Sequence, residues 1–499
     1  MSDADSKLNR RYVRYVLALL ALGNLLNYLD RNIIFALFEP IRRELHVSDT
    51  QLGWLGSAYA IVFSLGALFA GVLSDLTSRR TVIAGSVALW SGFTAVGGVI
   101  RSYWQLFVSR AFVGVGQSAY LPAAQALLAD YYPTQGRAQA MGIFWAGLAL
   151  GGVLAVWLGG VLATAFGWRQ ALVLVGLPGL LFALLLTRLR DPVARAAPVV
   201  ARAAAPKFRI TWRVAARTVM PLGVSLLLAT AVFGFLALFE NLPASLDLVA
   251  FGVIAGAGLM WTIWQWVRIA MVRLPEAASA PADVVDEMLD AASLVLRTPT
   301  LIWLFLGGAL TSASMNSLVA WSTSFLQREL DLTLLEAGRR IGPIGLVAGV
   351  LGSWTGGRLG DVLFERWPSG RVLAGALGFL VGAPICVGML LATDVSQFSI
   401  LFFLVVFLFT WYNGPIAAVL FDVVPREIGA TVMGAYVFFI HIAGDAIALP
   451  VVGFLSDRYG LRPALLTLPV IGLVGGLILT FAVFTVGRDM QRLKVKPAA

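Results

Sequence analysis

The sequence has few charged residues, a single cysteine and only two histidines. Asp, Glu, Lys and Arg make up 13% of its 499 residues, about half the share found in ordinary soluble domains. The lone Cys386 excludes a disulfide framework and a cysteine metal cluster. Apart from His46 and His441 the chain has no histidine, and no cluster of His, Cys and carboxylate residues has the spacing of metal ligands or of a nucleophile and its base. We therefore expect no metal, no cofactor and no enzyme activity.

Long apolar runs dominate the sequence instead. Hydrophobic residues form 59% of the chain, and its mean hydropathy is +0.84. About fourteen runs have about 20 or more residues, the length that crosses a ~30 Å hydrocarbon layer. We therefore predict an all-α multi-pass membrane protein. The predicted spans are residues 15–38, 52–74, 81–100, 104–129, 139–165, 169–187, 218–238, 247–271, 299–326, 337–360, 371–392, 396–421, 430–455 and 463–485.

The positive charges lie in the short connections between these runs. A net charge of +10 does not indicate a nucleic-acid partner, because the Lys and Arg residues form no patch on a soluble domain. With a cytoplasmic N-terminus, roughly 25 of them lie on the inner side and about 9 outside, as the positive-inside rule requires. We expect both termini in the cytoplasm, a bacterial inner (plasma) membrane location and the lipid bilayer as the surrounding partner.

Three pairs of motifs recur in the same order. "DYYPTQGRAQAMG" (130–142) and "DVVPREIGATVMG" (422–434) share D-x2-P-x7-M-G at an offset of 292 residues. "GVLATAFGWRQAL" (160–172) matches "GFLSDRYGLRPAL" (453–465) at an offset of 293, and "GVLSD" (71–75) matches "GRLGD" (357–361) at 286. Duplicated bundles are common in secondary transporters, so we predict two six-helix bundles, residues 1–190 and 299–499.

The segment between the two bundles, residues 191–298, has a different character. It combines a basic Ala/Pro-rich stretch, two apolar runs and the acidic stretch "PADVVDEMLDAASLVLR", whose pattern predicts an amphipathic cytoplasmic helix. We predict a cytoplasmic linker with an inserted transmembrane hairpin, since an even number of crossings keeps the second bundle oriented like the first. The hairpin either wraps the bundle or takes part in transport.

The first span carries two adjacent charges in "LLNYLDRNIIF" (25–35). Burying a charge at the centre of a span costs about 2.5 to 3.5 kcal/mol, so Asp30 and Arg31 need partners or water. Arg31 shares a helical stripe with Asn27 and Tyr28, and Asp30 lies at its edge. Two interpretations remain open: these residues pin neighbouring helices together, or they line a substrate path.

Polar residues recur in the fourth span. Arg110 and Gln117 lie on one face, seven residues apart, and Tyr120 follows. A buried arginine either pairs with an acid from another helix, for which Asp30 is a candidate, or meets an anionic substrate. Both remain open.

The second bundle has its own candidates. His441 and Asp445 lie four residues apart, hence on one helix face, where they can share a proton or satisfy each other's hydrogen bonds. Asn413 precedes Gly414 and Pro415, a sequence that predicts a kink whose carbonyls face a cavity. The hydroxyl-rich "TSASMNSLVAWSTS" either packs helices or borders that cavity.

A further group marks the cytoplasmic helix ends. An acid at a helix end, with basic residues across the turn, can clasp neighbouring helices in one conformation and release them in another. The predicted cytoplasmic gate comprises Gly71, Asp75, Arg79, Arg80, Arg137 and Asp361.

The motifs G-x-L-x-D-x3-R-R after the second span and R-x3-G-x-G-x-[SA] in the fourth resemble the major facilitator superfamily. "NYLDRN", "RAFVGVGQSAY" and "HIAGDA…GFLSD" most resemble its Spinster-like group, some of whose members carry lysophospholipids or sphingosine phosphate. The resemblance implies the major facilitator fold and places Asp30, Arg31 and Arg110 in the cavity and coupling network. Gln117 stands where that group usually has an acid. Because an amide cannot titrate, a coupled proton would be carried by Asp30, Asp445 or His441; otherwise the protein is a facilitator.

These observations predict a monomeric secondary transporter for a small amphipathic or anionic organic solute, for example a lysolipid-like molecule, working by alternating access with or without protons. Arg31 and Arg110 would attract the anion, and Tyr28, Tyr120, Trp145 and Trp321 would line apolar walls. An organic anion/cation symporter of a neighbouring branch and a non-transporting membrane sensor or scaffold are the alternatives. No G-x4-G-K-[ST] loop supports an ATP-driven pump.

Overall fold

The computed structural model describes residues 3–76, 78–132, 137–189, 294–425 and 429–495, and every regular element within these ranges is a helix. Eight of the described helical segments are long and apolar enough to cross a membrane. The prediction of an all-α multi-pass membrane protein is thus confirmed. The hairpin predicted at 218–238 and 247–271, and the amphipathic helix after it, lie outside the described residues.

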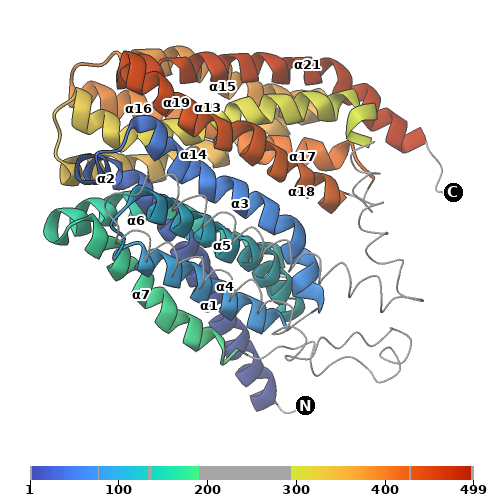
Figure 1. The fold of residues 1–499 in the computed structure, drawn as a ribbon. Coiled ribbons are helices and arrows are strands. Elements are labelled where there is room, and N and C mark those ends of the chain that lie inside the picture. Colours follow the sequence, from blue (N-terminus) through green and yellow to red (C-terminus); the bar gives the residue numbers. More distant parts are fainter. Residues whose placement is uncertain (1–2, 77, 133–136, 190–293, 426–428, 496–499) are drawn as a thin grey trace, which may run out of the picture. The chain divides into compact units, whose positions relative to one another are not determined.

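Residues 3–189, drawn from blue to green in Figure 1, form the first half. Its helices are α1 (Asp3–Ala36), α2 (Phe38–Leu45), α3 (Asp49–Leu76), α4 (Arg79–Val96), α5 (Tyr103–Tyr131), α6 (Arg137–Phe166) and α7 (Trp168–Leu186). Six of these are long; five of them begin and end within four residues of the spans predicted from hydropathy, whereas α1 begins twelve residues before the predicted span 15–38. The short α2 was not predicted; it is amphipathic, burying Phe38 and Ile41 and exposing Arg42 and Arg43.

Residues 294–495, yellow to red in Figure 1, form the second half. Its helices are α13 (Pro299–Glu329), α14 (Leu334–Arg366), α15 (Gly370–Leu390), α16 (Val395–Phe409), η1 (Thr410–Tyr412), α17 (Asn413–Asp422), α18 (Gly429–Phe439), η2 (Ile440–Asp445), α19 (Ala446–Tyr459), α20 (Leu461–Leu465) and α21 (Thr467–Val495). The 3-10 turn η1 joins α16 to α17 just before Pro415, where the sequence predicts an irregularity. The π-helical turn η2 joins α18 to α19.

Corresponding loops of the halves adopt the same unusual backbone conformations. Gly167 and Gly460, 293 residues apart, both have φ of +88°. His46 and Asp331, 285 residues apart, are the non-glycine residues with positive φ in the described part of the chain, at +51° and +52°. Left-handed φ is uncommon outside glycine, so its recurrence at matched positions shows that the repeat extends to backbone geometry.

Ion pairs repeat in the same way at the ends where α1 and α13 begin, which we call the terminus side. Arg79 pairs with Asp130 in the first half. Arg371 pairs with Asp422 at 2.6 Å in the second half, and both members follow their counterparts by 292 residues. Arg371 also binds Asp361 at 2.8 Å. Each of these ion pairs lies within one half.

The two halves touch at the opposite ends of the helices, which we call the far side. A methyl group at Gly53 of α3 would collide with the carbonyl of Leu449, and one at Gly453 of α19 would collide with the carbonyl of Asp49. The helices α3 and α19 therefore meet backbone to backbone. Glycine permits such close approach between membrane helices.

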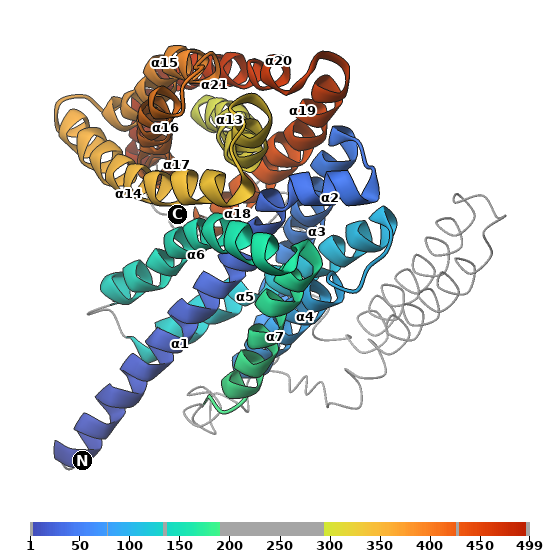
Figure 2. The same ribbon diagram turned by 90° about the vertical axis from the view of Figure 1, so that its left-hand side faces the viewer.

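The same contact recurs between α6 and α14, which lie side by side in Figure 2. A Cβ atom at Gly338 would lie 2.8 Å from the carbonyl of Val156, and one at Gly160 would lie 3.0 Å from the carbonyl of Leu334. All four residues are repeat partners of those in the α3–α19 contact, at offsets of 285 or 293. The two contacts, hereafter the far-side seams, are thus related by the internal repeat.

Candidate functional site

A buried ion pair joins three helices of the first half. Arg110 of α5 lies with its Nη1 3.8 Å from Oδ1 of Asp30 on α1, and both side chains are 2% exposed. Thr94 of α4 donates a hydrogen bond of 2.6 Å to the same carboxylate oxygen. Arg110 also donates to the carbonyl oxygens of Asp30 and Arg31, at 3.5 and 3.1 Å. Asp30 is therefore the acid that partners Arg110, one of the two possibilities left open by the sequence.

Arg31 has a different environment from Arg110. Its guanidinium carbon lies 5.6, 5.1 and 5.8 Å from the ring centres of Tyr28, Tyr59 and Phe63. These are distances at which a cation is attracted to an aromatic face. No carboxylate among the described residues lies within ion-pair distance of Arg31. Its positive charge is therefore held by aromatic rings rather than neutralised by a direct acidic partner.

Gln117 and Asn27 hold one of the rings around Arg31 in place through hydrogen bonds. The hydroxyl of Tyr59 donates to Oε1 of Gln117 at 2.8 Å, and Nε2 of Gln117 donates to the carbonyl of Asn27 at 3.2 Å. Gln117 and Asn27 are buried. The amide of Gln117 thus fixes Tyr59, one of the three rings around Arg31, and ties α5 to α1 and α3.

Two predicted site residues do not join this cluster. Tyr120 is fully buried inside the first half, where its hydroxyl donates to the carbonyl of Leu20 at 2.6 Å and its ring packs on Trp90. It therefore packs the bundle and lines no open wall. Asn413 is exposed at the start of α17 and contacts neither charged cluster in the described part of the chain.

Of the other residues predicted to line apolar walls, Trp321 is buried and Trp145 is exposed. Trp321 is fully buried and packs on Phe38 of the first half, with ring centres 5.1 Å apart. Trp145 is 41% exposed. Only Tyr28 of the four predicted wall residues lies at the charged cluster.

The second half contributes a compact polar cluster around Asp445. Its carboxylate accepts hydrogen bonds from Ser312 at 2.7 Å and Asn316 at 2.9 Å, and lies 2.7 Å from Nδ1 of His441. Asp445 is 2% exposed, whereas the His441 side chain is 16% exposed. The pair lies in the π-helical turn η2, and such turns occur frequently at functional sites. Ser312 and Asn316 come from the hydroxyl-rich stretch of the sequence.

The two clusters face each other. Phe63 of the first half packs edge-on against His441 of the second, with ring centres 6.2 Å apart. Arg31 interacts electrostatically with Asp445, and Tyr412 lies beside Asp445 and Ser312. Tyr59, Phe63 and Tyr412 were not predicted, because an aromatic residue in an apolar span carries no sequence signal of a polar role. An unpaired cation and a hydrogen-bonded acid thus approach from opposite halves.

A second ionic cluster connects the halves on the far side. Arg328, at the end of α13, donates to both carboxylate oxygens of Asp49, at 2.6 and 2.8 Å, and to Glu39 at 2.5 Å. The side chains of Glu39 and Asp49 are 2% and 3% exposed, and that of Arg328 is 16% exposed. Arg328 of the second half therefore forms ion pairs with two acids of the first half.

Two residues of α19 extend this contact. Asp457 accepts hydrogen bonds from the backbone N–H groups of Asp49 and Thr50, at 2.8 and 2.9 Å, and from the Thr50 hydroxyl at 2.6 Å. It thereby caps α3 from the other half. Ser456 donates to Asp49 at 2.5 Å. We call Glu39, Asp49, Arg328, Ser456 and Asp457 the far-side lock; hydropathy and motif spacing did not predict it.

The predicted cytoplasmic gate residues lie on the terminus side. Arg79 pairs with Asp130, Arg80 donates to the carbonyl of Leu189 at 3.2 Å, and Asp361 pairs with Arg371. The side chains of Asp75 and Arg137, and the surroundings of Gly71, lie outside the described residues.

The helical fold and the facing polar clusters define the class of protein, a multi-pass membrane transporter with two six-helix bundles. The family model described as Major Facilitator Superfamily matches residues 20–274 and 248–444. The chain therefore belongs to the major facilitator superfamily.

Individual relatives place it near the Spinster proteins. An MFS-type efflux pump of Mycolicibacterium smegmatis is 27% identical over 439 residues, covering 88% of this chain and 83% of the relative. Protein spinster of Drosophila melanogaster is 23% identical over 448 residues, which is 89% of this chain but only 62% of that longer protein. A bacterial homologue of the human lysosomal transporter Spinster, solved in an inward-facing and unoccupied conformation, superposes with a TM-score of 0.71 at 20% identity, covering 96% of this chain and 98% of the other.

Proposed function

We propose that this protein carries a small anionic or amphipathic organic solute, such as a lysolipid-like molecule, across the membrane by alternating access. The observation that carries the proposal is the cationic Arg31, held by aromatic rings without an acidic partner and facing Asp445 of the other half. A guanidinium left in this state keeps its donors for a carboxylate or phosphate. The three rings around it offer an apolar surface to the rest of the solute.

Arg31 and Arg110 take different roles in this proposal. Arg31 binds the anionic group directly. Arg110 positions α1 through its ion pair with Asp30 and its bond to the carbonyl of Arg31. Its buried Nε has no hydrogen-bond partner among the described residues, which leaves a donor for a solute that enters deeply.

Alternating access is supported by how the halves are joined. The far-side lock and the far-side seams connect the two halves, while the ion pairs of Arg79 and Arg371 on the terminus side each stay within one half. We take residues 1–190 and 299–499 as the two moving bundles. With both termini in the cytoplasm of a bacterial inner membrane, the far side is the external side, and this conformation is closed to the outside.

The His441–Asp445 pair supplies a route for proton coupling. Gln117 cannot titrate, and the carboxylate of Asp30 is already bound by Arg110 and Thr94. Asp445 and its imidazole partner are therefore the groups that would carry a coupled proton. An anion bound to Arg31 offsets the positive charge that Asp445 faces. Solute binding is thereby linked to protonation of the His441–Asp445 pair.

The test is solute flux into vesicles containing the purified protein. Labelled lysophosphatidylglycerol represents an amphipathic anion, and galacturonate represents the hydrophilic anions of the symporter alternative. We expect flux of the first, faster with an inward proton gradient if transport is coupled. Arg31→Gln should abolish flux without lowering the melting temperature, whereas Arg101→Gln, an exposed arginine on the far side, should have no effect.

Three outcomes bear against the proposal. Undiminished flux in Arg31→Gln would remove its central residue. Uptake of galacturonate alone would favour the symporter alternative. Saturable binding of either anion without any flux would identify a sensor.

A further inference from the structure

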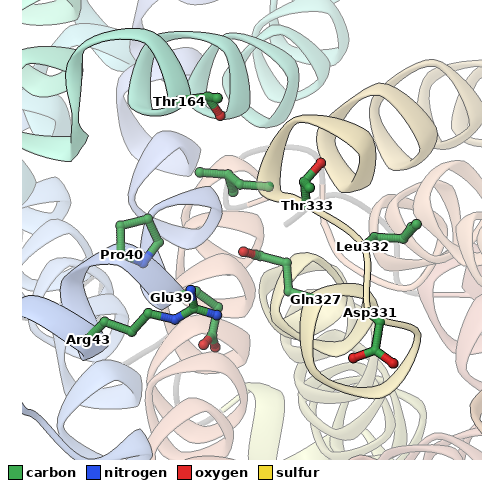
Figure 3. Close-up of a pocket in the computed structure, with 9 residues that line it drawn as sticks. Glu39, Pro40, Arg43, Thr164, Gln327, Asp331, Leu332 and Thr333 are labelled. Carbon is green, nitrogen blue, oxygen red and sulfur yellow. The ribbon is translucent and has the colours of Figure 1, made fainter.

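A cavity of about 490 Å³ opens on the far side between the two halves, and neither Arg31 nor Asp445 lines it. Figure 3 shows its walls, with Pro40 and Arg43 from the first half on one side and Gln327 and Asp331 from the second half on the other. Leu332 also lines it. Because each half supplies one wall, this cavity has its present shape only while the far side is closed.

The cavity carries one unpaired charge of each sign. Arg43 and Asp331 are exposed, and within the described part of the chain the side chain of neither has an ion-pair or hydrogen-bond partner. The other acid in the wall, Glu39, is already bound by Arg328. The charges available to a ligand are thus one guanidinium on the first-half wall and one carboxylate on the second-half wall.

Apart from Arg43, Asp331, Glu39 and Gln327, the lining is largely apolar. Pro40, Leu332 and Leu334 contribute hydrocarbon surface, and Thr164 and Thr333 add methyl groups beside their hydroxyls. A ligand that fits has a negative group at one end, a positive group at the other and a short hydrocarbon chain between them.

We propose that this cavity binds a small zwitterion, whose carboxylate pairs with Arg43 and whose ammonium group pairs with Asp331. Such a ligand bridges the two halves, so its binding stabilises the conformation closed on the far side, by mass action on that state. Exposed ion pairs contribute up to about 1 kcal/mol each, equivalent to about fivefold in affinity. The site is separate from the central clusters and does not depend on which solute they bind.

The test measures thermal stabilisation of the purified full-length protein by ω-amino acids. The probes are 4-aminobutyrate, 6-aminohexanoate and 8-aminooctanoate, with hexanoate and hexylammonium as analogues that carry a single charge. The variants are Arg43→Gln, Asp331→Asn and the charge-reversed double variant Arg43→Asp/Asp331→Arg. Arg101→Gln is the matched control, since Arg101 is an exposed far-side arginine that does not line the cavity.

We expect a saturable rise in melting temperature with at least one zwitterion, and binding about fivefold weaker for each single-charge analogue and each single variant. The charge-reversed variant should recover binding, because the zwitterion can bind in the opposite direction, and Arg101→Gln should bind like the wild type. The inference is overturned if no chain length stabilises the wild type, or if Arg43→Gln and Asp331→Asn bind the zwitterion as tightly as the wild type. Since the readout is binding, failure here leaves the vesicle assay of Arg31→Gln unaffected.

Discussion

Replacing Arg328 by alanine is expected to open the far side of the protein. The change leaves Glu39 and Asp49, whose side chains are 2% and 3% exposed, without the second-half guanidinium that binds both; only the more exposed Arg42 of the first half stays near them, at 4.0 and 3.2 Å. Removing one partner from a buried ion pair costs about 3 to 5 kcal/mol. Both acids regain water when the halves separate, so this cost falls on the closed state. At the lower end of that range, the balance shifts towards the open state by about 150-fold.

Pulsed electron paramagnetic resonance can measure this opening. Nitroxide labels at Arg101 and Leu391 report on the far side from different halves, because Arg101 lies between α4 and α5 and Leu391 follows the far-side end of α15. Leu391 is 54% exposed and tolerates a label, while the native Cys386 is fully buried. We expect the distance distribution of Arg328→Ala to move to longer values than that of the wild type.

Arg42→Ala provides the matched control. Arg42 also pairs with Asp49, at 3.2 Å, but both residues belong to the first half and the arginine side chain is 43% exposed. Its loss should leave the label distance unchanged. The reasoning is refuted if Arg328→Ala keeps the wild-type distribution, or if Arg42→Ala lengthens the distance equally.

Two further predictions concern packing and charge. In Gly453→Val, the new side chain meets the carbonyl of Asp49, so α3 and α19 should separate at the far-side seam and an external thiol reagent should reach cysteines placed there. Gly349→Val, where a Cβ meets nothing within 4 Å, should leave these cysteines as unreactive as in the wild type. Equal reactivity in the two variants would show that the seam does not close the far side. Asp30→Asn leaves Arg110 buried without its acid, so the free energy of unfolding should fall by about 3 to 5 kcal/mol. Thermal unfolding measures this loss, and an unchanged melting temperature would show that the pair does not stabilise the bundle.

The transmembrane helices could be predicted from the sequence because their cause is local. A run of about 20 apolar residues must satisfy its backbone hydrogen bonds within itself in lipid, so length and hydropathy are enough to place a helix. Most of the described helices follow these predictions within a few residues, although α1 begins twelve residues before its predicted span and α21 ends ten residues after its own. The short α2 was missed, since its eight residues are too few to span and its pattern is polar on one face.

The candidate site was only partly predictable. Asp30, Arg31 and Arg110 could be found because a charge in an apolar span is costly wherever its partner lies. The bond between His441 and Asp445 follows from their spacing on one turn. Tyr120 shared the polar span of Arg110 in the sequence, but the fold directs its hydroxyl to Leu20 inside the bundle.

What the sequence determined by itself was a duplicated all-helical membrane protein with ionic residues buried in both bundles, because hydropathy, charge cost and repeat spacing are properties of the chain alone. Only the tertiary structure decided which ionic residues meet. Arg31 is surrounded by Tyr28, Tyr59 and Phe63, and Arg328 is clasped by acids more than 270 positions away in the chain. The first contact depends on the packing of α1 against α3 within one half, and the second on the packing of the two halves against each other; neither the spacing nor the type of residue encodes that packing locally.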